Sequence, residues 1–462
     1  MQQMESGEDR EAKEPSRTMT GWTVALTCVA IVACGVIVSG LLHKPEPELT
    51  TAPVPTTKPA PAVDRTYVTP PVVFPVDIPG CDVVDPPGDG TLTGYAAIDK
   101  FGYDNPAYPW FSGPKAVAMS RALQDALPDG VDFPFASLEQ SLFFRPIVDP
   151  DTGSGERPDF GGWTTASGGL LRGGKAGDLI VSVRKSAAPM PHCVAGDLDE
   201  RRHLADGTTV DVHDTWYQVG KVRTRTRSAD AYLTDGTVVT TYATDAGNDG
   251  SSHSGTVPLT VDELAAVATA PGLRVTASVP SGTPDVPESC GTWPEIGGTK
   301  DKDAGKIDED AAHRLNAVLA QIPLDGLTLD RPLGQLRPAT MASGMCQVVR
   351  IITPGRQSRL SIAITVGQRP PEQSAMASEF GGDRATSRQL PDGTVVENRE
   401  SRNMKTPNQP DAQPVSETIR TVTTTRKSGT RVEVRSTAEW PADPLSFEQL
   451  ESIAVNPGLE VR

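Results

Sequence analysis

The sequence predicts an α+β protein: two tandem homologous domains, each a mostly antiparallel sheet with packed helices, behind one transmembrane helix and a proline-rich linker. Three features carry this prediction: an uncharged apolar run near the N-terminus, a proline-rich stretch after it, and a motif that occurs twice at an offset of 186 residues. They divide the 462 residues into a cytoplasmic disordered tail at 1–21, a transmembrane helix at 22–42, a linker at 43–79, and repeat domains at 80–278 and 279–462.

The apolar run is Trp22–Leu42, which has 21 residues and no charged side chain. A helix of this length reaches about 32 Å, which matches the hydrocarbon core of a bilayer. The run is longer than the apolar part of a secretory signal peptide and is not followed by an A-x-A cleavage pattern. We therefore expect a retained single-pass helix, with the lipid bilayer as the partner of residues 22–42. A lipoprotein signal is the alternative, because Ile31–Cys34 resembles a lipobox.

The composition of the rest of the chain favours an orientation for that helix. Four of the six cysteines, an even number compatible with disulfides in an oxidising compartment, lie in the large C-terminal part. We therefore expect a cell-membrane protein with a cytoplasmic N-terminus and an extracytoplasmic body. Ten prolines between Lys44 and Pro79 favour extended polyproline II, so the linker is expected to act as a spacer between membrane and body.

The repeated motif has the chemistry of a helix with defined ends. Its two copies, Leu259–Val275 and Leu445–Val461, share seven of 17 residues at an offset of 186. In the first copy, Thr260 and Glu263 have the spacing of a capping box, and a Pro-Gly pair follows the apolar face of the helix. Ser446 and Gln449 repeat the capping box in the second copy. The motif therefore predicts a capped helix followed by a closing strand.

Other segments recur in the same order in the two halves. Each half is expected to open with a helix, at Lys115–Leu127 and Ala311–Ile322. Stretches with strand character follow at Leu142–Val148, Leu179–Arg184, Val348–Ile352 and Leu360–Val366. Tight hairpin turns are expected at four Asp-Gly or Ser-Gly pairs, which begin at Asp206, Asp235, Asp392 and Ser428.

The four cysteines of the body are expected to form one disulfide in each domain. Cys81 and Cys290 each precede the first helix of their domain, so we predict the pairs Cys81–Cys193 and Cys290–Cys346. Four cysteines allow three pairings, and Cys193 and Cys346 do not align in the repeat. Such bridges would fasten the first segment of each domain to its sheet and stabilise it by roughly 2–4 kcal/mol.

The layout resembles that of uncharacterised single-pass envelope proteins of high-GC Gram-positive bacteria. The resemblance rests on the helix motif that ends in Ala-Pro-Gly-Leu, on its second copy, and on the bias toward Ala, Gly, Pro, Asp and Arg. It extends over the membrane helix, the linker and both halves. It implies no functional residues.

Motifs of catalysis, metal binding and cofactor binding are absent from the sequence. There is no HExxH, GxSxG, Walker A or CxxC motif, and the histidines are scattered. We therefore expect no enzyme activity, no metal and no cofactor. A formal net charge of −16 argues against nucleic acid as a partner.

The most asymmetric feature is an aromatic cluster in the first half. Six of the 23 aromatic residues lie within 17 positions, and five residues of this region are the candidate binding site: Tyr95, Tyr103, Tyr108, Trp110 and Phe111. Aromatic platforms bind sugars and peptides and dominate protein interfaces. The alternative is that this segment buries its rings against its own sheet.

These observations predict a non-catalytic, membrane-anchored protein that binds or senses a cell-wall polymer or an envelope protein outside the membrane. One alternative is a transmembrane regulator, similar to an anti-sigma factor, that acts through its short cytoplasmic tail. The other is an envelope hydrolase with an unrecognised site.

Overall fold

The computed structural model describes residues 65–461 except 89–95, 99–101, 152–160, 248–251, 291–306, 325, 340–343, 354–355, 371–383 and 406–413. The chain divides into a unit at Met1–Val63 and a compact unit at Asp64–Arg462. The predicted membrane helix at 22–42 lies outside the described residues. Among the residues that are described, no helix is long and apolar enough to cross a bilayer.

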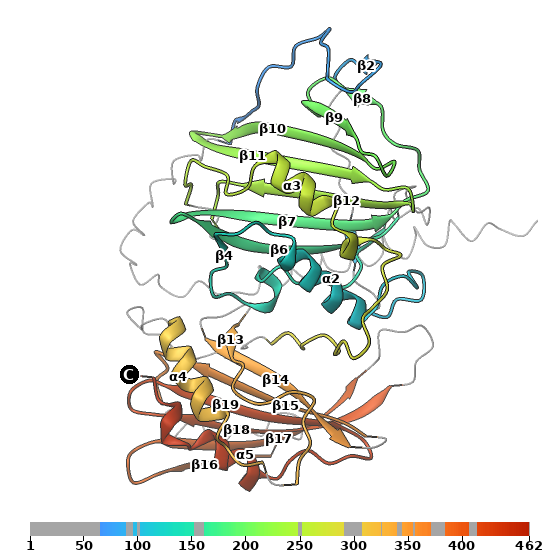
Figure 1. The fold of residues 1–462 in the computed structure, drawn as a ribbon. Helices are drawn as coiled ribbons and strands as arrows, with labels where there is room; N and C mark the ends of the chain where they lie inside the picture. Colours follow the sequence, from blue (N-terminus) through green and yellow to red (C-terminus); the bar gives the residue numbers. More distant parts are fainter. Residues whose placement is uncertain are drawn as a thin grey trace, which may run out of the picture. The chain divides into compact units, whose positions relative to one another are not determined.

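The described chain is rich in antiparallel sheet and contains two sheet bodies with few helices (Figure 1). The first sheet has eight strands and the order β1-β10-β11-β12-β7-β6-β4, with β9 paired to β10. These strands are β1 (Tyr67–Val68), β4 (Val131–Asp132), β6 (Trp163–Arg172), β7 (Lys175–Lys185), β9 (Glu200–His203), β10 (Thr209–Val219), β11 (Val222–Tyr232) and β12 (Thr237–Thr244). Two small sheets, β2 (Val84–Asp85) with β8 (Cys193–Val194) and β3 (Ala96–Ile98) with β5 (Asp149–Asp151), accompany it.

The second sheet has seven strands in the order β13-β14-β15-β19-β18-β17-β16. They are β13 (Arg337–Pro338), β14 (Met345–Thr353), β15 (Arg356–Thr365), β16 (Arg384–Gln389), β17 (Val395–Lys405), β18 (Val415–Thr425) and β19 (Arg431–Glu439). The order β14-β15-β19-β18-β17 repeats β6-β7-β12-β11-β10 of the first sheet. The duplication seen in the sequence is therefore also a duplication of strand topology.

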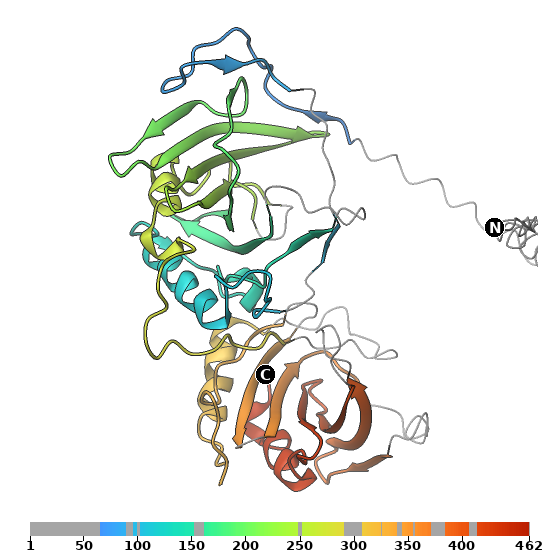
Figure 2. The ribbon, with the colours of Figure 1, turned by 90° about the vertical axis from the view of Figure 1, so that its right-hand side faces the viewer.

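The helices of each domain pack on one face of its sheet. In the first domain, α2 (Gly113–Asp125) and α3 (Val261–Ala268) lie on the same side of the strands (Figure 2). Their apolar faces share one core with alternate residues of the strands, including Leu179, Val181 and Val183 of β7. In the second domain, α4 (Glu309–Leu319) and α5 (Phe447–Ala454) share a core with Leu360, Ile362 and Ile364 of β15. This alternation leaves the other residues of each strand on the face away from the helices, here called the far face.

Local signals in the sequence were confirmed where neighbouring residues supply both partners. Both capping boxes form, because Thr260 and Ser446 each accept from the backbone at N3 while the N3 side chain accepts from the cap backbone. The four hairpin turns also form, with positive φ at Gly207, Gly236, Gly393 and Gly429. In three of them the Asp side chain accepts from the backbone N–H two residues on, at Thr208, Thr237 and Thr394.

Two strand predictions are wrong: the one at Leu142–Val148 and the closing strand of the repeated motif in both copies. In each case the segment makes too few backbone hydrogen bonds to the sheet to form a strand. Leu142–Val148 is an irregular edge whose amides at Leu142, Arg145 and Val148 donate to β6. The closing segment of each motif is a short 3-10 turn, Pro271–Leu273 or Pro457–Leu459, and not the start of a strand. After the turn, Val275 and Val461 each donate their backbone N–H to a threonine hydroxyl, Thr237 or Thr430.

Candidate functional site

The predicted aromatic site lies largely in the core of the first domain. Tyr108 and Phe111 are buried, and Tyr103 and Trp110 are partly buried against the same core. The rings of Trp110 and Phe111 are tilted with centroids 5.4 Å apart. Tyr95 lies outside the described residues. This packing favours the interpretation in which the segment covers its own sheet, and ligand binding by these rings stays a prediction.

Both predicted disulfides are present. Cys81 pairs with Cys193 and Cys290 pairs with Cys346, with Cα–Cα distances of 6.2 and 6.0 Å. Cys346 lies on β14, so the second bridge fastens its domain to the main sheet as expected. The first bridge instead joins the chain to β8 of the small β2–β8 sheet. There, Cys193 packs with Ile78 and Leu198 in a separate small apolar cluster.

A cleft of about 720 Å³ opens on the far face of the first sheet. We call it the tyrosine cleft. Its floor consists of residues from three adjacent strands: His213, Thr215 and Tyr217 of β10, Thr226 of β11 and Tyr242 of β12. Because Val210 and Val212 point into the helix-covered core, the odd-numbered residues of β10 reach the far face.

Two segments form the walls of the tyrosine cleft. One is the chain at 67–78, which begins with β1 at the edge of the sheet and belongs to the compact unit although the sequence placed it in the linker. The other is the turn at 195–199 after β8. The disulfide-linked cluster of Ile78, Cys193 and Leu198 connects these two walls, and Ile78 and Leu198 themselves line the cleft.

Three tyrosines lie together in this cleft. The rings of Tyr67 and Tyr217 are stacked, with centroids 5.8 Å apart and an interplanar angle of 25°. The side chain of Tyr242 bonds to Thr226, and burial raises the pKa of Tyr242 to about 12. Its hydroxyl therefore stays protonated at neutral pH and can donate or accept a hydrogen bond.

The cleft also contains a histidine–aspartate pair. His213 Nδ1 lies 3.3 Å from Asp199 Oδ2, and the side chain of His213 is 20% exposed. The same carboxylate oxygen accepts from the backbone N–H of Asp214 at 2.7 Å, which fixes its position. An imidazole next to a fixed carboxylate can act as a hydrogen-bond donor to a ligand or as a proton acceptor.

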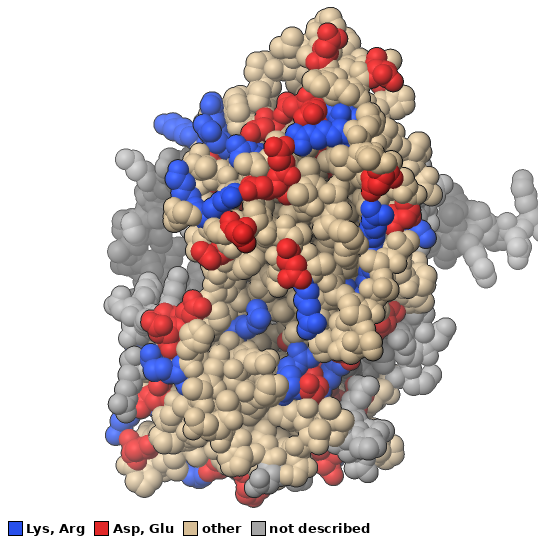
Figure 3. All heavy atoms as spheres, viewed as in Figure 1, with Lys and Arg blue, Asp and Glu red and all other residues tan. Residues whose placement is uncertain are grey.

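The charged residues of the cleft are almost all acidic. Asp77, Asp197, Asp199 and Asp214 line it, and no Lys or Arg of the described chain does. Asp214 is paired with Arg227 at 2.8 Å, whereas Asp77 and Asp197 are exposed and have no ion-pair partner among the described residues. On the opposite, helix-covered side of the first domain, Lys and Arg lie among Asp and Glu (Figure 3). No group of three His, Cys, Asp or Glu side chains in the described residues is arranged to hold a metal ion.

The second domain offers an internal comparison, because its strands align with those of the first. Thr209 pairs with His203 and Val395 pairs with Gln389, which fixes an offset of 186 for β10 and β17. Tyr232 faces Val238 and Thr425 faces Arg431, which fixes an offset of 193 for β11 and β12. At the positions of His213, Tyr217 and Tyr242, the second domain therefore has Arg399, Asn403 and Arg435.

Structural contacts of the fold are kept under the same alignment. Arg227 bonds to Asp214 and to the Leu259 carbonyl, and the aligned Arg420 bonds to Glu400 and to the Leu445 carbonyl. The cleft residues differ while this scaffold contact is retained. The tyrosine and histidine side chains of the cleft are thus not a requirement of the fold.

Sequence reasoning missed these residues because they are dispersed over more than 170 positions, from Tyr67 to Tyr242. A signal was present in the repeat itself. Aligning the hairpins shows that Tyr217 and Tyr242 are replaced by Asn403 and Arg435, whereas the turn glycines are kept and the cap residues change only to others that form the same capping box.

No protein-family model and no curated protein matches the chain. One solved structure, described as the di-domain ARO/CYC StfQ from the steffimycin biosynthetic pathway, was found with 11% sequence identity over 76% of this chain and 84% of that chain. Its TM-score of 0.12 is too low to indicate a shared fold, so the function of that protein carries no argument for this chain.

Proposed function

We propose that this chain is a membrane-anchored, extracytoplasmic binding or sensing protein of the cell envelope without catalytic activity, and that the tyrosine cleft is its binding site. The observation that carries the proposal is that the cleft residues His213, Tyr217 and Tyr242 are not kept at the aligned positions of the homologous second domain, which has Arg399, Asn403 and Arg435 there. These side chains are not needed by the scaffold. The cleft has the size and chemistry of a ligand site: its volume is about 720 Å³, and it is lined by three tyrosines and a histidine, Tyr67, Tyr217, Tyr242 and His213.

The chemistry of the cleft supports a ligand of the envelope. Stacked rings offer flat apolar faces, and the hydroxyls of Thr215, Thr226 and Tyr242 offer hydrogen bonds. A cell-wall polymer or an exposed segment of an envelope protein presents both kinds of group. The predicted spacer would place the cleft outside the membrane, where such ligands occur.

The test uses the full-length protein in detergent with isolated peptidoglycan sacculi and envelope-protein extract. We expect retention on at least one of them, and at least about tenfold weaker binding by Tyr217→Asn/Tyr242→Arg, since tyrosines in pockets are typical hot spots. This variant carries the residues that the second domain has at the same positions, so it is expected to fold.

The matched control is Asn403→Tyr/Arg435→Tyr, which makes the reciprocal change in the second domain. It should bind like the unmodified protein. Retention on neither material, or equal binding by both variants, would contradict the proposal. Unfolding curves for each variant separate loss of binding from loss of structure.

One observation favours a second candidate function, hydrolysis of an envelope polymer. His213 Nδ1 lies 3.3 Å from Asp199 Oδ2 without a hydrogen bond between them, so a small rotation of the imidazole would be needed before the carboxylate could orient it as a general base. In such a reaction the imidazole would activate a water molecule as the nucleophile. Product release from sacculi that is abolished by His213→Gln, with retention unchanged, would favour hydrolysis over binding alone.

A further inference from the structure

We infer that the tyrosine cleft takes a peptide segment that carries a primary ammonium group on an aliphatic stem, as a lysine side chain does. The inference rests on the proposed function and adds the chemical class of the ligand. Three properties of the cleft support it: its uncompensated charge, its aromatic faces and its apolar wall.

The charge of the cleft favours a cationic ligand over an anionic one. Of the four aspartates that line it, Asp214 directs its carboxylate to Arg227 on the helix-covered face, and Asp199 lies next to His213. Asp77 and Asp197 have neither an ion-pair partner nor a hydrogen bond to their carboxylates in the described part of the chain. These two carboxylates make the rim of the cleft negative, which favours a bound ammonium group over a phosphate or carboxylate ligand.

The tyrosines add a second source of attraction for a cation. The faces of aromatic rings carry partial negative charge, and a cation within about 6 Å of a ring centroid is attracted to it. The same sheet already contains one such contact, because the Arg223 guanidinium lies 3.8 Å from the ring centroid of Trp216. No Lys or Arg of the described chain lines the cleft next to its three tyrosines, Tyr67, Tyr217 and Tyr242.

The apolar wall fits the stem of such a side chain and the chain that carries it. Val72 and Val73 are 46% and 69% exposed and lie between Pro71 and Pro75. Long aliphatic stems pack on surfaces of this kind while their charged ends stay in a polar environment. A volume of about 720 Å³ is larger than one side chain and accommodates several residues of a peptide.

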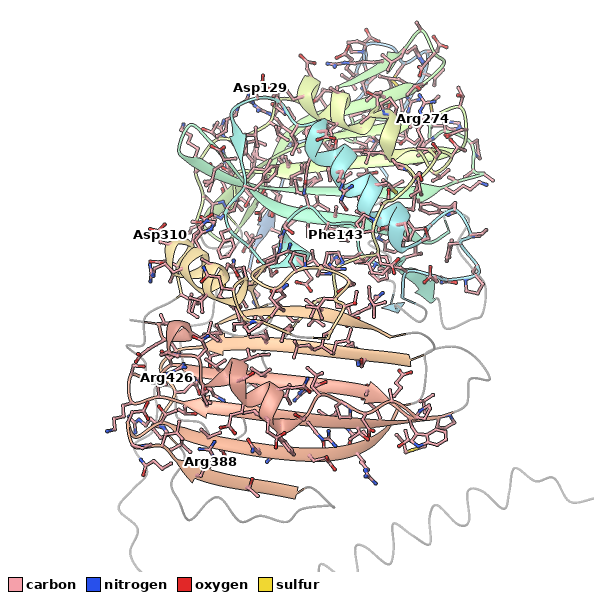
Figure 4. All side chains as sticks on the ribbon, turned by 60° about the horizontal axis from the view of Figure 1, so that its bottom comes forward. Asp129, Phe143, Arg274, Asp310, Arg388 and Arg426 are labelled. Carbon is pink, nitrogen blue, oxygen red and sulfur yellow. A yellow bond between two sulfur atoms is a disulfide. The ribbon has the colours of Figure 1, made fainter. Side chains whose placement is uncertain are left out.

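The experiment measures binding of two capped peptides, Ala-Ala-Lys-Ala-Ala and its Nε-acetyl-lysine counterpart, to the full-length protein by calorimetry. We expect the lysine peptide to bind about three- to tenfold more tightly, and Asp77→Asn/Asp197→Asn to remove that difference. The matched control, Asp310→Asn/Asp443→Asn, changes the net charge equally. Its sites are exposed in the second domain, Asp310 at the start of α4 (Figure 4).

The outcomes separate this inference from the proposed function. Equal binding of the two peptides, binding of neither, or an equal loss in the control variant overturns the inference. If N-acetylated sacculi are retained as well as untreated sacculi, and retention still requires Tyr217 and Tyr242, the proposed site stands and the ammonium ligand is wrong. A neutral glycan is then the ligand that the hydroxyl-rich floor would accept.

Discussion

Lys115 shows how much a single side chain can contribute to the first domain. It is 3% exposed at the beginning of α2, and its ammonium donates to the backbone carbonyls of Arg274, at 2.8 Å, and Ala277. These bonds fasten the segment that follows α3 to the first helix of the domain. Burial lowers the pKa of Lys115 to about 8, and the carboxylate of Asp235 opposes this shift in part.

The lowered pKa predicts a specific pH dependence of stability. Between pH 8 and 10.5 the folded chain has released the Lys115 proton while the unfolded chain still holds it, so the free energy of unfolding rises with pH in this window. In Lys115→Met this contribution is absent. We expect the unmodified protein to gain stability relative to the variant by on the order of 1–3 kcal/mol from pH 7 to 9.5, measured by urea unfolding. A difference between the two proteins that does not change with pH would contradict this expectation.

Among the secondary-structure elements, the two copies of the capped helix differ in one respect that the sequence motif hides. In α3, Glu263 not only closes the capping box but also accepts two bonds from Arg172 of β6, at 2.8 and 2.9 Å. In α5, Gln449 makes the capping contact from an exposed position. The hydrogen bond to Arg172 is the largest cause of the lowered pKa of Glu263. One copy of the box therefore also joins its helix to the sheet.

This difference predicts unequal effects of equivalent substitutions. Thr260→Ala and Ser446→Ala should each cost about 1 kcal/mol, the typical value for loss of an N-cap side chain. Glu263→Ala should cost about 1 kcal/mol more than Gln449→Ala, because it also leaves the partly buried Arg172 without its carboxylate. Urea unfolding of the four variants measures this, and equal effects of the Glu263 and Gln449 substitutions would show that the Arg172 contact contributes nothing to stability.

Across the whole molecule, the two disulfides connect different kinds of structure. Cys290–Cys346 fastens the chain before α4 to the main sheet of the second domain, and Cys81–Cys193 fastens the wall of the tyrosine cleft to the small β2–β8 sheet. The wall is attached to the sheet by β1 at its beginning and by the Pro79 carbonyl, which accepts from Arg201 N–H, whereas the cluster around Cys193 contains few apolar residues. Within the second domain, Arg426 donates to the Asn456 carbonyl at 2.7 Å and holds the turn after α5 (Figure 4).

Removal of each bridge should therefore have a different result. Cys81→Ser/Cys193→Ser should weaken ligand retention while the first sheet stays folded, because the wall at 67–78 loses its covalent link to β8 and is then held only by β1 and the bonds near Pro79. Cys290→Ser/Cys346→Ser should lower the free energy of unfolding by roughly 2–4 kcal/mol and leave retention unchanged. Retention assays and unfolding curves on both variants measure this, and unchanged retention without Cys81–Cys193 would contradict the assigned wall.

The sequence by itself determined the features whose partners are close along the chain. Capping boxes, hairpin turns and helix faces depend on residues two to four positions apart, so Thr260, Asp206 and their counterparts in the second copy indicated the α+β class and the duplication. Pairing Cys81 with Cys193 also followed from domain order.

Tertiary structure alone decided the candidate site. The aromatic residues that are dense in the sequence pack into the core, whereas Tyr67, Tyr217 and Tyr242 meet only because strand pairing brings β1, β10 and β12 into one sheet. Strand neighbours are selected by long-range packing and register, which neighbouring residues do not encode.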